Sequence, residues 1–153
     1  MFFVVITISP RPVGRNLGTI SFASTLYLRP ILDLLLAEIP YRWQAELRLG
    51  LQEALVNAAK HGNNLDPSKL VIVRFSLANN HYWWVIADQG CGFNPPYNCH
   101  TDPAQYLPPE QAESGRGLCI LHEIFDQVQW NQEGTELKLG KQVNNRFRLP
   151  LVS

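Results

Sequence analysis

The segment LQEALVNAAKHGNN, residues 51–64, combines an apolar stripe with a polar one. Glu53, Asn57 and His61 are spaced four residues apart, so an α-helix places them on one face. Gly62 follows them and predicts the end of that helix, because glycine tolerates the backbone conformation of a helix C-terminus. The opposite stripe predicts a side packed into a core. Its members are Leu47, Leu51, Ala54, Leu55 and Ala58.

The chain before this segment predicts a strand and two helices. LGTISFAS, residues 17–24, has strand composition. Thr25 is expected to cap a first helix, with Pro30 early in it, since apolar residues then recur at helical spacing as far as Ile39. Pro40 ends that helix, and the second helix is expected over residues 42–61.

The chain after it changes to extended patterns. Residues 69–78 and 81–88 predict two strands joined by a tight turn at Asn79-Asn80, since asparagine accepts positive φ. A proline-rich stretch then predicts a long loop as far as Ser114, where a helix is expected to start. Residues 128–132 and 135–143 predict a closing hairpin around Glu133-Gly134, with a last short strand at 146–149. This order predicts an α+β fold, a two-layer sandwich with helices on one face of a mixed, mostly antiparallel sheet.

Length and composition indicate one globular domain. The 153 residues carry 13 basic and 13 acidic side chains, and this balance favours neither nucleic acid nor an anionic membrane as a partner. Cys91, Cys99 and Cys119 are an odd number without metal-type spacing, which predicts free thiols in a reducing compartment. The apolar start MFFVVITI is too short to span a bilayer and lacks the features of a signal peptide. We therefore expect a cytoplasmic protein, with residues 1–17 as an N-terminal strand or lead-in to a domain over 18–153.

Two further patches resemble parts of a ligand site. DQGCGF, residues 88–93, follows an apolar strand, and its glycines allow backbone to approach a ligand closely. SGRGL, residues 114–118, is expected to open a helix, where free N–H groups and Arg116 favour an anion. Each patch alone also has an ordinary structural explanation: a solvated stripe at Glu53, a strand-ending turn at Asp88 or a capped helix at Ser114.

In this order the three patches resemble the GHKL ATPase superfamily, whose domain is also called the Bergerat fold. EALVNAAKHGN, ADQGCGF, SGRGLCIL and the later GTELKL are similar to the anti-sigma-factor serine kinases of bacteria. The resemblance covers residues 18–141, and it places a nucleotide lid at about 93–114. It implies an enzyme that uses ATP and Mg²⁺.

The resemblance also implies a role for each site residue. Glu53 is the expected catalytic base or orienting group, and Asn57 is the expected Mg²⁺ ligand. Asp88 is expected to accept a hydrogen bond from the adenine amino group. The remaining nucleotide-binding residues that the resemblance implies are His61, Gly90, Gly92, Gly115, Arg116, Gly117 and Thr135.

The implied activity is that of a protein-serine kinase. Its substrate would be a STAS-type antagonist, a sigma factor would be a second partner, and the resemblance allows a homodimer. Two alternatives stay open: an ATP-binding regulator with little turnover, and the catalytic domain of a histidine kinase. Glu53 argues against the first, since a binding module has no need of that carboxylate. The absence of a phosphoacceptor helix before Thr25 argues against the second.

Overall fold

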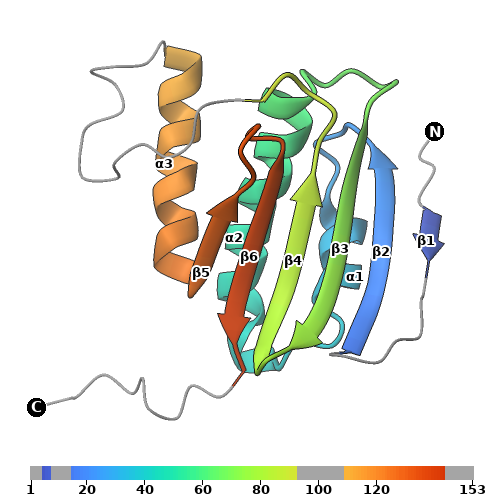
Figure 1. The fold of residues 1–153 in the computed structure, drawn as a ribbon, viewed down its shortest axis with the longest axis vertical. Coiled ribbons are helices and arrows are strands. Elements are labelled where there is room, and N and C mark those ends of the chain that lie inside the picture. The colour runs from blue at the N-terminus through green and yellow to red at the C-terminus, as the bar shows by residue number, and fades with distance from the viewer. Residues whose placement is uncertain (1–4, 8–14, 93–108, 144–153) are drawn as a thin grey trace, which may run out of the picture.

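The computed structural model of the chain describes residues 5–7, 15–92 and 109–143. In Figure 1 the helical segments 29–35 and 41–62 lie behind one face of the sheet, the helix over 109–124 stands beside the sheet edge, and the other face is open toward the viewer. The strands are β1 (Val5–Thr7), β2 (Arg15–Ala23), β3 (Leu70–Ala78), β4 (His81–Ala87), β5 (Gln127–Trp130) and β6 (Glu136–Gln142). The helical segments are α1 (Arg29–Leu35), α2 (Tyr41–Val56), η1 (Asn57–Gly62) and α3 (Pro109–Ile124).

The six described strands form one sheet in the order β1-β2-β3-β4-β6-β5. All of their pairings are antiparallel, and the α+β two-layer fold is confirmed. The β3–β4 hairpin turns at Asn79 and Asn80, both at positive φ, as predicted. The β5–β6 hairpin turns at Gly134, which has φ 73°. The predicted strand at 146–149 and most of the predicted lid, 93–108, lie outside the described residues.

The core lies between the sheet and the helices. Alternate residues of β3 and β4 point into it, so the adjacent tryptophans separate: Trp84 is fully buried, whereas Trp83 lies on the open face. The predicted apolar stripe of α2 is buried along its whole length. Within the described part of the chain, no helix is both long and apolar enough to cross a lipid bilayer.

The first helix differs from the prediction at its N-terminus. Thr25 does not cap it; α1 begins at Arg29 after Leu28, and no side chain caps it there. Thr25 instead accepts a hydrogen bond from the backbone N–H of Tyr27 at 3.0 Å, in a local turn before the helix. Pro30 lies in the first turn, where a missing N–H costs nothing.

The second predicted helix has two parts. It is α-helical from Tyr41 to Val56, and from Asn57 to Gly62 it is a π-helix. The backbone N–H of Asn63 accordingly donates to the carbonyl of Ala58, five residues back, at 2.9 Å. Short π-helical segments occur frequently at functional sites, and this one begins at Asn57.

Helix α3 corrects the prediction that a helix starts at Ser114. It begins at Pro109, so the last residues of the predicted lid and all of Gly115–Gly117 are helical. The physical reason is available in the sequence: proline fits the first position of a helix, where its missing N–H has no intrahelical partner to lose. In this conformation residues 115–117 do not form a free helix N-terminus.

Candidate functional site

Helix α3 lies directly against α2, and glycines allow the close approach at two levels. At Gly50 of α2, an added Cβ would lie 2.6 Å from Cε2 of Phe125, at the end of α3. At Gly117 of α3, an added Cβ would lie 2.8 Å from Oε2 of Glu53 and 3.7 Å from Nδ2 of Asn57. Two of the predicted patches, the stripe of α2 and the glycine-rich segment of α3, therefore meet at Glu53.

A buried lysine holds the far end of α3. Lys141 of β6 donates from Nζ to the carbonyl of Ile124 at 2.8 Å and lies 3.5 Å from the carboxylate of Glu46. A cation at the last carbonyls of a helix also interacts favourably with the helix dipole. The position of α3, and with it the contact between Gly117 and Glu53, is thus fixed from the sheet.

Asn57 has an unsatisfied polar atom. Its Nδ2 is buried and, within the described ranges, has no hydrogen-bond partner. Such a group costs about 1–3 kcal/mol when buried, so its retention beside Glu53 indicates a place where a polar ligand contributes the missing contact. Rotation of the amide by half a turn would present its oxygen, the atom that coordinates a hard cation, in the same place.

Asp88 follows β4, and the loop that it begins lies against the end of η1. Its backbone N–H donates to the carbonyl of Thr135 at 2.9 Å, and its Oδ1 accepts from the N–H of Gly90 at 2.9 Å. A Cβ added at Gly62 would collide with the Asp88 carboxylate, and one added at Gly90 would collide with the carbonyl of Gly62. The stripe and the DQGCGF patch are therefore in direct contact.

The electrostatic environment of Asp88 is unusual for an aspartate. Partial burial raises the pKa of its carboxyl group above the ordinary value, and the Gly90 N–H and the charge of Lys69 only partly oppose this. A carboxylate in such a place is a strong hydrogen-bond acceptor with little water to compete for it.

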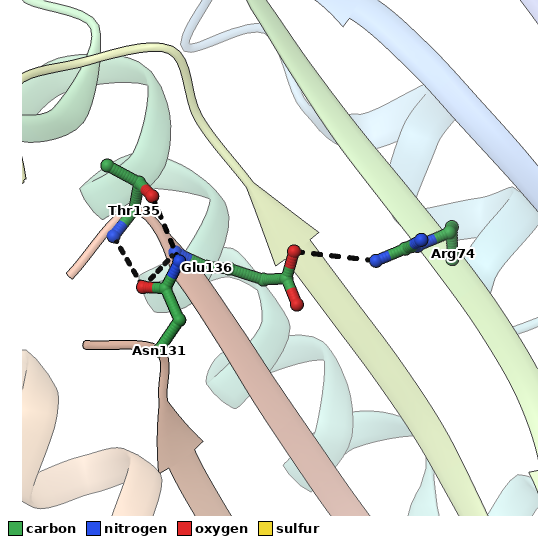
Figure 2. Close-up of polar contacts among 4 residues, drawn as sticks. All are labelled: Arg74, Asn131, Thr135 and Glu136. Carbon is green, nitrogen blue, oxygen red and sulfur yellow. Dashed lines mark hydrogen bonds and ion pairs between the residues drawn. The ribbon is translucent and has the colours of Figure 1, made fainter. Parts of the chain in front are cut away.

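The turn between β5 and β6 borders the same loop. Gly92 has φ 83°, and a Cβ there would collide with the carbonyl of Glu133 and lie 3.5 Å from Cγ2 of Thr135. Asn131 holds Thr135 in place, as Figure 2 shows: its Nδ2 donates to Oγ1 of Thr135 at 3.1 Å, and its Oδ1 accepts from two backbone N–H groups. Glu136 donates one of these and also forms a 3.4 Å ion pair with Arg74.

For the remaining predicted site residues, the structure gives the position in the fold. His61 is half-buried in η1, four residues after Asn57. Gly115 and Arg116 lie in α3, and contact between their N–H groups and phosphate would require the first turns of α3 to open.

Sequence reasoning missed two asparagines that hold this site together. Asn131 fell inside the predicted strand 128–132, and Asn63, directly after Gly62, was given no role. Asn63 is fully buried and hydrogen-bonded to three separate segments. An Asn-Asn pair after a helix glycine is the only signal in the sequence, and it does not distinguish a buried side chain from a solvated one.

The geometry agrees with a comparison against protein families. Residues 33–141 match the model of the histidine kinase-like ATPase domain. The chain belongs to this family. The match includes Gly50, Glu53, Asn57 and Gly117 of the α2–α3 contact, and it also includes the Asp88 loop. Lys141 is the last residue that it covers. An ATPase domain binds ATP, and ATP is therefore the ligand class of the family.

Individual relatives of this ATPase domain are moderately similar. The chain is 26% identical to the anti-sigma F factor of Clostridium perfringens over 102 residues, 65% of this chain and 72% of the relative. It is 29% identical to the anti-sigma F factor of Geobacillus kaustophilus over 101 residues, 64% of this chain and 68% of the relative. It is 26% identical to the serine-protein kinase RsbW of Bacillus subtilis over 104 residues, 65% of this chain and 64% of the relative. The predicted resemblance to GHKL ATPases and anti-sigma-factor kinases is confirmed at the level of the family and of these relatives.

Proposed function

We propose that this chain is an ATP-dependent protein-serine kinase of the anti-sigma-factor type. One observation carries the proposal: Glu53 and Asn57 face Gly117 of α3, while Asp88 lies against Gly62 at the other end of the same helical segment. Glu53 and Asn57 at one end would meet the phosphates of a nucleoside triphosphate, and the half-buried carboxylate of Asp88 at the other end would meet its base. The anti-sigma factors and the serine kinase among the relatives support the same reading.

Asn57 would hold Mg²⁺. The chain suits this ion, because no group of three His, Cys, Asp or Glu residues in the described ranges forms a protein cage, and Mg²⁺ commonly binds one or two protein oxygens together with substrate phosphates. The orphaned amide of Asn57 is the observation that fits it. When bound, the ion would neutralise charge on the phosphate oxygens.

Glu53 would act on the serine that receives the phosphate. Its carboxylate accepts the hydroxyl proton, or orients that hydroxyl, as the serine oxygen bonds to the terminal phosphorus and the bond to the leaving ADP oxygen breaks. The half-buried position beside Gly117 holds the carboxylate in one place. Most of the acceleration then comes from positioning, with a smaller share from the basicity of Glu53.

Asp88 would select adenine. An ionised carboxylate accepts from the amino group of adenine, whereas guanine presents an oxygen there and leaves both acceptors unsatisfied. Thr135 and Gly92, which lie near each other at the rim of this loop, would border the base. His61, Gly90, Gly115 and Arg116 remain proposed contacts, the last two with phosphate.

The proposed substrate is a STAS-type antagonist, and the proposed second partner is a sigma factor. Transfer of phosphate to the antagonist would release it and leave the kinase free to hold the sigma factor. Phosphate transfer is the only chemical step in this exchange, and it uses the ATP that is already bound when the antagonist docks. The exchange therefore needs no catalytic residue besides those named above.

The test is phosphate transfer in a defined mixture. The purified chain is incubated with Mg²⁺ and ATP labelled on the terminal phosphate, together with STAS proteins encoded by the same genome. We expect label on a serine of one of them, abolished by Glu53→Ala and Asn57→Ala and retained in Gln52→Ala, an exposed neighbour on α2. Binding of ATP without transfer to any STAS protein would contradict the kinase and favour a regulator that only holds nucleotide.

A further inference from the structure

We infer that Asn63 is a positioning residue for adenine selection: its side chain fixes the Asp88–Gly90 loop in the orientation that lets Asp88 read the base. The inference rests on the proposed function, since it concerns the adenine end of the same site. It assigns a specificity role to a buried amide that contacts no substrate itself.

Asn63 makes hydrogen bonds with three segments that are distant in sequence. Its Nδ2 donates to Oγ of Ser24 and to the carbonyl of Leu70, both at 2.9 Å, and its Oδ1 accepts from the backbone N–H of Gln89 at 2.7 Å. The partners fix which end of the amide is which, because the Leu70 carbonyl only accepts and the Gln89 N–H only donates. With no exposed surface, the side chain has no water to exchange for these bonds.

The bond to Gln89 fixes the peptide group that follows Asp88. Three successive N–H groups of the loop are engaged in different directions: that of Asp88 with Thr135, that of Gln89 with Asn63, and that of Gly90 with the Asp88 carboxylate. Because the middle bond holds the plane of the Asp88–Gln89 peptide, it also determines where Gly90 presents its N–H to Oδ1. Asn63 therefore acts on the carboxylate through two covalently connected residues.

A second tie anchors the same loop to β3. The Oε1 of Gln89 accepts from the backbone N–H of Leu70 at 2.7 Å, while the carbonyl of Leu70 accepts from Asn63. Leu70 begins β3, so these hydrogen bonds attach the loop to the sheet. A loop held in this way is pre-organised and loses little entropy when it binds a base.

Asn63 also connects the two ends of the site. Its backbone N–H closes the π-helical segment that begins at Asn57, through the 2.9 Å bond to Ala58. The residue before it, Gly62, is in contact with the Asp88 carboxylate. The spacing between the amide of Asn57 and the carboxylate of Asp88 is thus set by the short segment η1, which Asn63 closes.

The experiment compares two nucleotides that differ only in the group that Asp88 would contact. Dissociation constants are measured with Mg²⁺ for ATP and for purine riboside triphosphate, in which hydrogen replaces the amino group of adenine. For the wild type we expect about 10- to 100-fold tighter binding of ATP, the value of one charge-assisted hydrogen bond. Asn63→Ala is expected to reduce this preference at least about fivefold.

Ser24→Ala is the matched control. It removes one hydrogen bond of Asn63 on the side away from the loop and keeps the bond to Gln89, so we expect lower stability with the nucleotide preference unchanged within about twofold. If the role of Asn63 is purely structural, Asn63→Ala will weaken the binding of both nucleotides equally. The ratio of their dissociation constants would then keep its wild-type value, and this result would overturn the inference.

Amide hydrogen exchange in the wild type tests the same bond without any substitution, should Asn63→Ala not fold. We expect slow exchange at the Gln89 N–H, although Gln89 is exposed and lies beyond the end of β4. Exchange at the rate of an open loop would overturn the inference. If the folded wild type does not bind ATP, the proposed function fails and the inference with it, whereas wild-type selectivity that Asn63→Ala preserves defeats the inference alone.

Discussion

Gly117→Ala separates catalysis from stability at the contact between α2 and α3. The new Cβ would lie 2.8 Å from Oε2 of Glu53, whereas ordinary contact begins near 3.4 Å. The carboxylate is the far end of a flexible side chain, so it moves and the helices do not. We expect it to shift by about 0.6 Å, the difference needed to restore contact.

The expected result is a slower enzyme that is at least as stable. Alanine in place of glycine inside a helix adds about 0.5–1 kcal/mol to the unfolding free energy. A misplacement of about 1 Å costs on the order of 100-fold in rate. We therefore expect kcat for phosphate transfer to fall about 10- to 100-fold, with little change in the KM for ATP, because Asp88 and its loop are not touched.

The assay is steady-state transfer to the antagonist, with urea denaturation run on the same samples. Glu53→Gln gives the level of activity without the carboxylate, and Glu123→Ala, an exposed substitution on α3, controls for changes to that helix. A folded Gly117→Ala protein with kcat within about twofold of the wild type would refute the placement of Glu53 at the reacting hydroxyl.

Three further substitutions test other parts of the structure. Gly50→Ala should lower the unfolding free energy in urea by about 1–3 kcal/mol, since its Cβ would lie 2.6 Å from the ring of Phe125 in a packed core; an unchanged midpoint would contradict that packing. Asn131→Ala should cost about 1–3 kcal/mol in the same assay and weaken ATP binding, because the turn around Thr135 loses three hydrogen bonds; ATP affinity equal to wild type would argue against a role for this turn. Burial raises the pKa of Asp88, so the stability that this shift contributes is complete below the ordinary pKa of 3.8 and is lost as pH rises through the folded value. The stability of the wild type relative to Asp88→Asn should therefore increase on acidification while ATP binding weakens, and a pH-independent difference would contradict the burial.

Local patterns were sufficient to predict most of the fold. The Asn79-Asn80 turn follows from the tolerance of asparagine for positive φ, and the buried stripe of α2 follows from its spacing. The start of α3 was missed because proline was read as a breaker, although Pro109 occupies the one helical position that favours it. A proline either ends a helix or occupies its first turn. Which of the two it does depends on whether the residues after it are helical, and the proline itself does not reveal this.

The sequence pointed to residues that the structure brings together, but it gave no sign of the side chains that hold them in place. Spacing placed Glu53 and Asn57 on one face, and the structure adds that Gly117 covers them. The π-helical turn at Asn57 and the buried amide of Asn63 depend on contacts with Ser24, Leu70 and Gln89. These contacts arise between segments that are far apart in the chain, so no local pattern specifies them.

Calorimetric titration of the folded chain with ATP tests most directly whether these segments form one nucleotide site. With Mg²⁺ present, we expect saturable heat for one ATP per chain, a much weaker response to GTP, and weaker binding when the metal is chelated or Asn57 is replaced by alanine. Absence of heat from ATP with Mg²⁺, in protein shown to be folded, would contradict the site itself.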